Sequence, residues 1–144
     1  MKRLPSLLRI AQTDYLAQIG ILIPVVIWIM ALIVALWDRE SAAFFRVLAP
    51  ALTLIGATLF FWRWHVITST FEDGSRAAGT LVAIQFFRGR GRAIYVYTAA
   101  GQKLMTSNAV NNTPQARALR PGQDVTVTYH PLDPKRAFVD ELYL

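Results

Sequence analysis

The stretch YLAQIGILIPVVIWIMALIVALW, residues 15–37, decides the fold because it contains no formally charged side chain. A helix needs about 20 apolar residues to cross the hydrocarbon core of a bilayer. The apolar region of a cleavable signal peptide has only about 7–15 residues. The stretch therefore predicts a transmembrane helix. Pro24 lies inside it and predicts a kink, because neighbouring groups in a membrane protein can satisfy the carbonyl that a proline leaves free.

A second apolar run, AAFFRVLAPALTLIGATLFFWRW, covers residues 42–64. Only the polar residues 38–41 separate it from the first run, so the two predicted spans form an antiparallel hairpin. Arg46 lies near the start of the second run. We interpret it as a side chain that reaches the headgroups or pairs with Asp38 or Glu40, with a functional intramembrane charge as the alternative. The aromatic residues at the predicted boundaries are those of an aromatic belt: Tyr15, Trp37, Trp62 and Trp64.

Small side chains line one face of the second predicted span. They recur at a spacing of four residues, which is the pattern that lets two helices approach closely. Ala31 and Ala35 offer a similar face on the first span. We therefore expect this small-residue face to contact another helix, from this chain or from a partner. Its members are Ala49, Thr53, Gly56 and Ala57.

Lysine and arginine residues predict the orientation, because they are enriched in cytoplasmic loops. Lys2, Arg3 and Arg9 precede the first span and further arginines follow the second, whereas the break between the spans holds only Arg39. We expect a multi-pass protein of the bacterial inner (cytoplasmic) membrane with both termini in the cytoplasm. Residues 1–14 predict a short amphipathic lead-in helix on the membrane surface, with a frayed terminus as the alternative.

The composition agrees with a membrane protein. Apolar residues make up 54% of the 144 residues and charged residues only 17%, whereas soluble domains have about 25% charged residues. The chain has no cysteine, which excludes disulfides, thiolate zinc sites and cysteine nucleophiles. The net charge of +6 favours an anionic partner. For a membrane protein, anionic lipid is a better candidate for this partner than nucleic acid.

From residue 79 onward the pattern changes to short runs of strand formers with turn residues between them. Five such strands predict a small antiparallel β-barrel or sandwich at residues 79–144, after a linker at residues 65–78. The predicted fold class is thus an α+β membrane protein, with a transmembrane hairpin at residues 15–64 followed by this domain. The expected strands are 79–87, 93–98, 103–110, 124–129 and 135–144, with a loop and one helical turn at 111–122.

The stretch FFRGRGRAIY, residues 86–95, joins two of the predicted strands and is interpreted as a hairpin loop with its glycines at positive φ. No helix follows it, so it lacks the context of a phosphate-binding loop. A nucleic-acid contact would need more repeats and exposed stacking aromatics. Arg88, Arg90 and Arg92 remain candidates for contact with anionic lipid or a partner. Each arginine near an anionic leaflet contributes about 1 kcal/mol of attraction.

The ending of the chain carries a recognisable motif. Pro121-Gly122 is followed by Val125-x-Val127-x-Tyr129 and then by the prolines of HPLDP, residues 130–134. With Gly79-Thr-Leu-Val upstream, this order resembles a widespread bacterial family of unknown function, whose members carry transmembrane helices beside a small β domain. The resemblance covers about residues 79–139 and implies that architecture, but no activity. His130 stands where the family often has aspartate.

The same ending has a physical interpretation that concerns the fold alone. Pro121 and Gly122 form a turn that starts a strand, because proline presets the first φ and glycine permits the second. Tyr129 ends that strand and its hydroxyl can hold the adjoining loop. Pro131 and Pro134 are expected to fix an extended link, which lowers the entropy lost on folding.

Chemical candidates are few. His130 and Asp133 could form a triad only with a serine such as Ser107, and nothing marks a nucleophile elbow or an oxyanion hole. The predicted spans hold no Asp or Glu for a proton relay. We therefore expect a protein that is not an enzyme, with no catalytic, cofactor-binding or metal-binding residues and no small-molecule substrate.

The expected function is a membrane-anchored, non-catalytic interaction module, an accessory or assembly subunit of a larger inner-membrane complex. Its partners would be the bilayer and another membrane protein or a second copy of the chain, without nucleic acid. An immunity-type protein that protects against a membrane-active toxin is the alternative, and a membrane protein that senses anionic lipids is a minor one. A subunit should co-purify with host membrane proteins, whereas a protector should matter only when the toxin is present.

Overall fold

The computed structural model describes residues 4–144, apart from the side chain of Arg39. Lys2 and Arg3, which contribute to the predicted orientation and lead-in helix, lie outside the described residues. The chain divides into two compact units. The helical unit is Leu16–Arg63, and the β unit joins Met1–Tyr15 to Trp64–Leu144.

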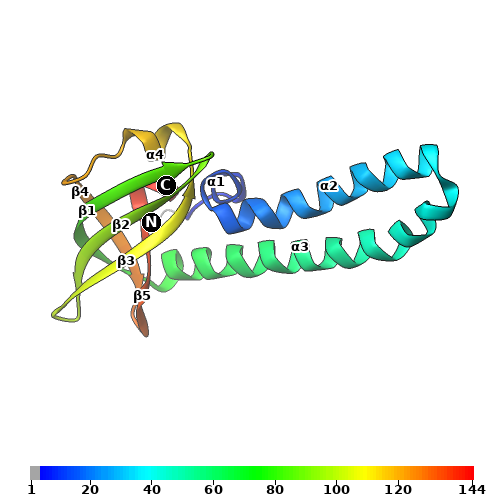
Figure 1. The fold of residues 1–144 in the computed structure, drawn as a ribbon. Coiled ribbons are helices and arrows are strands. Elements are labelled where there is room, and N and C mark those ends of the chain that lie inside the picture. The colour runs from blue at the N-terminus through cyan, green and yellow to red at the C-terminus, as the bar shows by residue number, and fades with distance from the viewer. Residues whose placement is uncertain (1–3) are drawn as a thin grey trace. The chain divides into compact units, whose positions relative to one another are not determined.

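Two long helices supply the helical unit (Figure 1): α2, Tyr15–Trp37, and α3, Arg39–Asp73. Both are long and apolar enough to cross a membrane, with mean hydropathies of 3.0 and 1.8 over their most apolar windows. Only 11% of each window is buried, whereas a core helix of a soluble protein is mostly buried. The first predicted span has the bounds of α2, and Pro24 lies within this helix.

The break between the two helices is shorter than the expected residues 38–41. Only Asp38 is non-helical, and its side chain caps the start of α3. The amide of Glu40 donates to Asp38 Oδ1 at 3.0 Å, and the Ser41 hydroxyl donates to Asp38 Oδ2. The hydrogen bonds from Ser41 lower the pKa of Asp38. An aspartate before a helix satisfies amides that have no partner inside it, which explains why the helix starts immediately after this residue.

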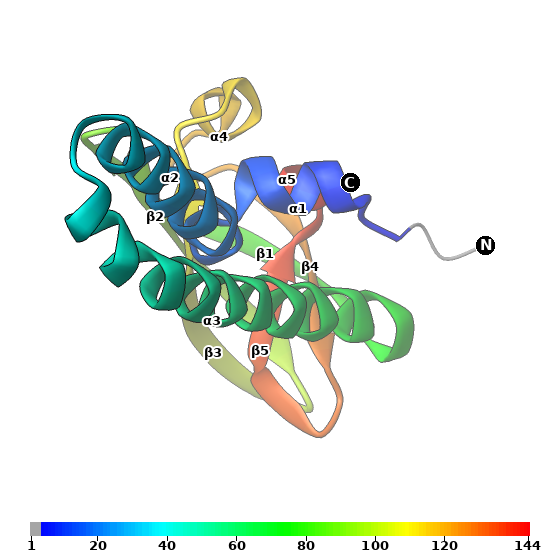
Figure 2. The same ribbon diagram turned by 90° about the vertical axis from the view of Figure 1, so that its right-hand side faces the viewer.

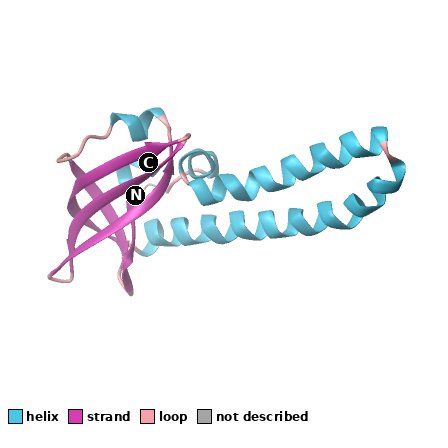
Figure 3. Ribbon diagram, in the orientation of Figure 1, coloured by secondary structure: helices cyan, strands magenta, loops and turns pink. Residues whose placement is uncertain are grey.

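The β unit contains one antiparallel sheet of five strands in the order β3-β2-β1-β4-β5. Figure 3 shows how the strands curve around a common interior. The predicted five-stranded, barrel-like domain is therefore confirmed. The strands are β1, Ser75–Phe87; β2, Arg90–Ala99; β3, Gln102–Asn111; β4, Asp124–His130; and β5, Asp133–Val139.

Side chains, rather than a backbone ladder, connect the two edge strands β3 and β5. The Tyr95 hydroxyl and Asn108 Nδ2 both donate to the backbone oxygen of Ala137, at 2.6 and 3.0 Å. Thr106 Oγ1 donates to the oxygen of Lys135 at 3.3 Å. Because these bonds reach across the open edge, the sheet is nearly closed. Its core is formed by inward-facing residues of all five strands, including Leu81, Tyr95, Tyr97, Val110, Val127 and Val139.

Residues 65–78, expected to be a linker, instead form the last turns of α3 and the first residues of β1. Ile67, Thr70 and Phe71 are buried, and their spacing of three and four residues places them on one face of the helix. Phe71 lies against Phe138 and Tyr143, with ring centroids 6.3 and 6.2 Å away. Packing on the β unit therefore extends the helix beyond its apolar run.

The lead-in segment also belongs to the β unit. Helix α1, Leu7–Thr13, contacts the short C-terminal helix α5, Asp140–Tyr143 (Figure 2). Ile10 and Thr13 are fully or almost fully buried there, and Thr13 Oγ1 donates to the backbone oxygen of Leu142 at 3.2 Å. Of the predicted apolar stripe of this helix, Leu4, Leu7, Leu8, Ala11 and Tyr15, the three leucines are exposed, whereas Ala11 and Tyr15 are half-buried. The expected surface helix thus forms, but its other face packs on protein.

The end of the chain differs from the expected strand 135–144. The strand begins earlier, at Asp133, and after Val139 the chain turns into α5. Leu142 and Tyr143 are fully buried, so the helix places two large side chains in the core. Between β3 and β4, the expected helical turn is present as α4, Pro114–Ala118. The Thr113 hydroxyl caps this helix by accepting from the Ala116 amide at 3.2 Å.

Candidate membrane and partner contacts

Gly56 of the small-residue face lies inside the helical hairpin. A Cβ atom on Gly56 would be 2.6 Å from the backbone oxygen of Gly20 and 2.7 Å from Cδ of Pro24. Pro24 has no amide hydrogen to donate to the oxygen of Gly20 four residues earlier. The missing side chain of Gly56 thus lets the backbone of α3 approach the carbonyl that this proline leaves free.

The other small residues lie along the same side of α3. Ala49 is fully buried, while Thr53 and Ala57 are half-buried. Thr53 Oγ1 donates to the oxygen of Ala49 at 2.7 Å and lies 3.0 Å from the indole nitrogen of Trp28, which donates to it. The structure therefore brings this face against α2 of the same chain, with a hydrogen bond as well as close packing.

The predicted hairpin loop is a two-residue turn. Phe87 pairs with Arg90, so only Arg88 and Gly89 lie between the strands, with φ angles of 49° and 83°. Positive φ at both central residues is the turn whose twist matches a β-hairpin. Gly91 was also expected at positive φ, but it lies in β2, where a Cβ would be 2.5 Å from the Phe86 ring. We call residues 87–92 the arginine tip.

Arg90 of the arginine tip contacts Tyr15, the first residue of α2. Its Nη1 donates to the Tyr15 hydroxyl at 2.7 Å, and its guanidinium carbon lies 5.3 Å from the centre of the Tyr15 ring. Arg88 covers the exposed Phe87 ring in the same way, at 5.2 Å. The sequence pattern indicated the arginines but not these aromatic partners, because Tyr15 is distant in sequence and was expected in the aromatic belt and on the apolar stripe of the lead-in helix.

The Pro121–Gly122 turn lies between α4 and β4. The Gln123 amide donates to the oxygen of Arg120 at 3.1 Å, and Gly122 has a φ of 84°. This is the geometry of a type II turn, with proline first and glycine second. The turn also extends the sheet, because the Gly122 amide donates to the oxygen of Leu81 at 2.7 Å.

The loop after β4 is held by Tyr97 rather than by Tyr129. The Tyr97 hydroxyl donates to the oxygen of Pro134, and burial, followed by the nearby Asp133 charge, raises the pKa of Tyr97 to about 12. Tyr129 contributes its ring, 5.9 Å from that of Tyr97. The alternation in AIYVYT, which places Tyr95 and Tyr97 on the inner face, was the signal for this role.

The HPLDP stretch is a tight turn and not the extended link expected from its prolines. His130 pairs with Asp133, so Pro131 and Leu132 alone connect β4 to β5. The Leu132 amide donates to His130 Nδ1 at 3.3 Å, which gives His130 a place in the turn. A proline suits the first central position of a turn as well as an extended segment, so the prolines alone did not justify the extended link.

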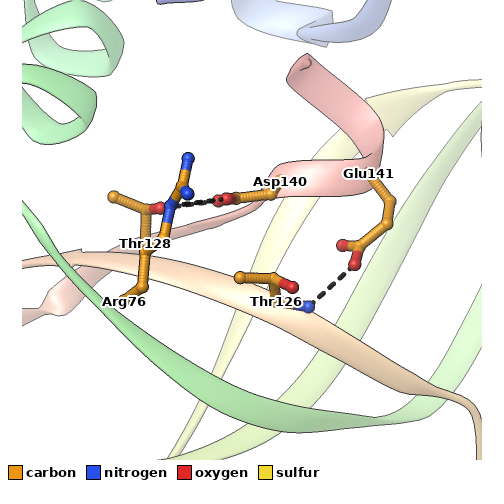
Figure 4. Close-up of polar contacts among 5 residues, drawn as sticks. All are labelled: Arg76, Thr126, Thr128, Asp140 and Glu141. Atoms are coloured by element: carbon orange, nitrogen blue, oxygen red, sulfur yellow. Dashed lines mark hydrogen bonds and ion pairs between the residues drawn. The ribbon is translucent and has the colours of Figure 1, made fainter. Parts of the chain in front are cut away.

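A partly buried polar cluster, centred on Thr128 and Asp140, holds α5 to the sheet (Figure 4). Asp140 accepts from the Thr128 hydroxyl at 2.6 Å and pairs with Arg76 Nε at 3.2 Å. Beside it, Glu141 accepts from the Thr126 amide at 2.9 Å. Burial raises the pKa of Asp140, against the lowering effects of Thr128 and Arg76. Because both oxygens of Asp140 have partners in the fold, we assign this cluster to structure rather than to chemistry.

Within residues 4–144, no group of three or more His, Asp or Glu side chains is placed to hold a metal ion. His65 and His130 lie in α3 and β4, and His130 contacts its own turn. The other buried carboxylate, Asp14, accepts from the Tyr143 hydroxyl at 3.2 Å, which joins α1 to α5. The two buried carboxylates, Asp14 and Asp140, thus stabilise the β unit, to which both belong.

Comparison with known proteins identifies the β unit but no activity. No curated protein and no solved structure matches the chain. A domain of unknown function, DUF3592, matches residues 66–142. This range includes the resemblance drawn from residues 79–139 and starts earlier, in the part of α3 that packs on the sheet. Since the match covers more than half of the 144 residues, the chain belongs to the DUF3592 family, which is defined by a domain of unknown function.

Proposed function

We propose that this chain is a membrane-anchored, non-catalytic interaction module, an accessory or assembly subunit of a larger complex in the bacterial inner membrane. The observation that carries the proposal is the exposure of the two span-length helices, of which only 11% of each apolar window is buried. Apolar surface of this extent is stable against lipid or against other membrane proteins. The β unit then lies on the cytoplasmic side, where the positive-inside rule places the arginines that flank the helices.

The outward face of α3 supports contact with another membrane protein. Gly56 and Ala49 are used inside the hairpin, so a partner would meet the remaining exposed side chains. Helices in lipid associate by close packing rather than by the hydrophobic effect. Large, exposed apolar side chains along a helix provide a surface for such packing. The exposed large residues of α3 are Phe44, Val47, Leu54, Ile55, Phe61 and Trp62.

The absence of catalysis in this proposal rests on how the buried polar groups are used. Asp14 joins α1 to α5, Asp140 holds α5 to the sheet, and the Tyr95 and Tyr97 hydroxyls donate to backbone oxygens. A catalytic acid or base needs a free position toward a substrate. These groups are instead committed to the fold, and the exposed surfaces are left for binding.

Site-specific photo-crosslinking in intact cells tests the proposal. A photoreactive residue would replace Leu54 or Ile55 on α3, which are 70% and 58% exposed, and Leu36 on α2, which is 75% exposed. A subunit should give one discrete adduct from one of these helices, in a membrane fraction that resists alkaline extraction. An adduct of twice the chain's mass would identify a second copy as the partner.

Two results would contradict the proposal. A chain that alkaline extraction releases from the membrane would not be anchored by its helices. Equal, diffuse labelling from Leu36 and Leu54 would indicate random collisions in lipid rather than a defined partner surface.

A further inference from the structure

The β unit has a strongly uneven distribution of charge. Between Asp73 and Asp124 the sequence contains no acidic residue, although this segment forms three of the five strands and α4. A surface with one sign of charge attracts anionic partners over distances of several ångströms. The cations of this segment are Arg76, Arg88, Arg90, Arg92, Lys103, Arg117 and Arg120.

The arginine tip is a well-defined part of this surface. The oxygen of Gly89 accepts from the Asn112 amide at 3.0 Å, and Asn112 Oδ1 accepts from Arg117 Nε at 2.8 Å. These bonds fix the turn against the end of β3 and place Arg117 beside it. Phe87 is 66% exposed at the tip, and the Arg88 guanidinium lies over its ring.

The contact between Arg90 and Tyr15 sets the depth of the tip. Tyr15 is the residue at which the uncharged run of α2 begins, and tyrosines in this position lie at the level of the lipid headgroups. Since Arg90 donates to the Tyr15 hydroxyl at 2.7 Å, the tip is held beside the residue that marks this level. Arg90 and Tyr15 both belong to the β unit.

A hollow of about 420 Å³ opens beside the turn and is lined by both apolar and basic residues. Arg90 and Arg92 form its basic part, Phe86 and Phe87 form its apolar part, and Gln85 and Gly91 complete the lining. Among the described residues, no ion pair joins Arg88, Arg90 or Arg92 to a carboxylate. Their charges are therefore available to an anion from outside the chain.

We propose that the arginine tip binds the phosphate headgroups of anionic lipids in the leaflet where α2 begins. Arg88 and Arg92 contact the phosphates, Arg90 positions the tip through Tyr15, and Phe87 enters the boundary of the acyl chains. Cations around an apolar side chain are the combination that binds an anionic membrane surface. This inference rests on the membrane anchoring in the proposed function and needs no protein partner.

The anchored position favours lipid over an acidic protein or a nucleic acid. A soluble acidic partner would gain nothing from Phe87 at headgroup level, and single-stranded nucleic acid needs several stacking aromatics along a groove. Lipid phosphate, by contrast, is present at high density wherever Tyr15 lies at the interface.

The test uses the full chain in lipid nanodiscs. Because the chain has no native cysteine, a spin label can be attached at Phe87→Cys alone, with Gln102→Cys at the exposed β2–β3 turn as the matched control. The rate of collision of the label with oxygen, compared with that with a water-soluble nickel chelate, reports the depth of the label in the bilayer.

In discs of phosphatidylcholine with phosphatidylglycerol, we expect collisions with oxygen to dominate at residue 87 and collisions with the chelate to dominate at residue 102. In the background of Arg88→Gln with Arg92→Gln, or in phosphatidylcholine alone, residue 87 should become accessible to the chelate.

Each outcome decides the inference. A label at residue 87 that stays equally aqueous in anionic and neutral discs would overturn it, and would leave an acidic protein as the partner of the arginines. Inorganic phosphate that displaces the label from anionic discs, where chloride of equal ionic strength does not, would assign the site to a soluble anion instead of lipid. A chain that fails to enter discs at all would disprove the proposed anchoring, and with it this inference. Entry into discs with an aqueous label would disprove the lipid contact alone.

Discussion

Gly56 lies so close to the backbone oxygen of Gly20 that a Cβ atom on Gly56 would be only 2.6 Å from that oxygen. This contact joins the two helices of the hairpin at the position where Pro24 removes a helical hydrogen bond. A side chain added there must separate the helices, whereas the same addition on the outer face of α3 meets no protein atom of the hairpin.

Gly56→Leu should therefore lower the free energy of unfolding of the helical unit by about 1–3 kcal/mol, the usual cost of overpacking. Unfolding in mixed micelles, followed by helical circular dichroism, measures this change. Ala51→Leu adds the same side chain at an exposed position of α3 and should be neutral. Equal stability of the two variants would mean that Gly56 does not form the helix contact.

Tyr97→Phe should destabilise the β unit by about 1–2 kcal/mol, because the oxygen of Pro134 loses its donor. Thermal unfolding in detergent, monitored by near-ultraviolet circular dichroism, checks the effect. Tyr129→Phe is the matched control, since among the described contacts Tyr129 offers its ring and not its hydroxyl. A similar loss in both variants would show that ring packing, and not the hydrogen bond, is responsible.

The stability of Tyr97→Phe should also depend less on alkaline pH than that of the wild type. Burial raises the pKa of Tyr97 to about 12, above the ordinary value of about 10. The folded state therefore holds this proton more tightly than the unfolded state, and the associated stability is present below pH 10 and is lost as the pH rises toward 12. In a pH series of unfolding temperatures, Tyr97→Phe should decline less steeply than wild type over this range. Parallel curves would contradict the assignment.

Asp140→Asn should change the pH dependence on the acidic side. Burial raises the pKa of Asp140, so the folded state binds this proton more tightly than the unfolded chain. Its contribution to stability grows as the pH falls through the raised pKa toward the ordinary value of about 3.9, and is lost as the pH rises. Asparagine still accepts from Thr128 but does not titrate, so the variant should gain relative to wild type as the pH rises. Asp124→Asn at an exposed position controls for the loss of one negative charge.

Arg136→Gln should loosen the end of α3. Arg136 Nη2 on β5 donates to the oxygen of Val66 and to the Ser69 hydroxyl, which holds the segment that was expected to be a linker. Hydrogen exchange by mass spectrometry should show faster exchange at residues 66–73, with little change in β2. Lys135→Gln removes a neighbouring exposed charge and should leave this segment protected; loss of protection in both variants would count against the role of Arg136.

The elements that follow from composition and periodicity could be predicted from the sequence. The uncharged run predicts α2 because it is long and apolar enough to cross a membrane, and DVTVTY alternates clearly enough to predict β4. The end of α3 was missed because Thr68, Ser69 and Thr70 suggest a loop. Their hydroxyls instead donate to carbonyls of the preceding turn, and the helix is stabilised by packing of Phe71. Helix α5 was missed because four residues are too few to show a period.

The contacts of the candidate sites depend on segments that are far apart in the sequence. Arg88, Arg90 and Arg92 could be singled out from their charge and the turn pattern. The partner of Arg90, however, is 75 residues away, and no local pattern joins the two. The alternation in AIYVYT indicates that Tyr97 faces inward. Its hydrogen-bond acceptor, the oxygen of Pro134, could not be predicted because it depends on whether HPLDP turns or extends. Close contacts such as that of Gly56 were indicated by the spacing of small residues, which left open which helix they meet.

The bonds between α1 and α5 join the first and last helices of the described residues. Thr13 meets Leu142, and Asp14 meets Tyr143, each across 129 residues. As the ribosome makes α1, its packing partners do not yet exist, and both span-length helices emerge before the first strand. The barrel can therefore be completed only after residue 143 has been synthesised, when both helices of the hairpin already exist. Folding of the β unit thus includes a long-range closing step, before which the unpaired strand edges are open to aggregation.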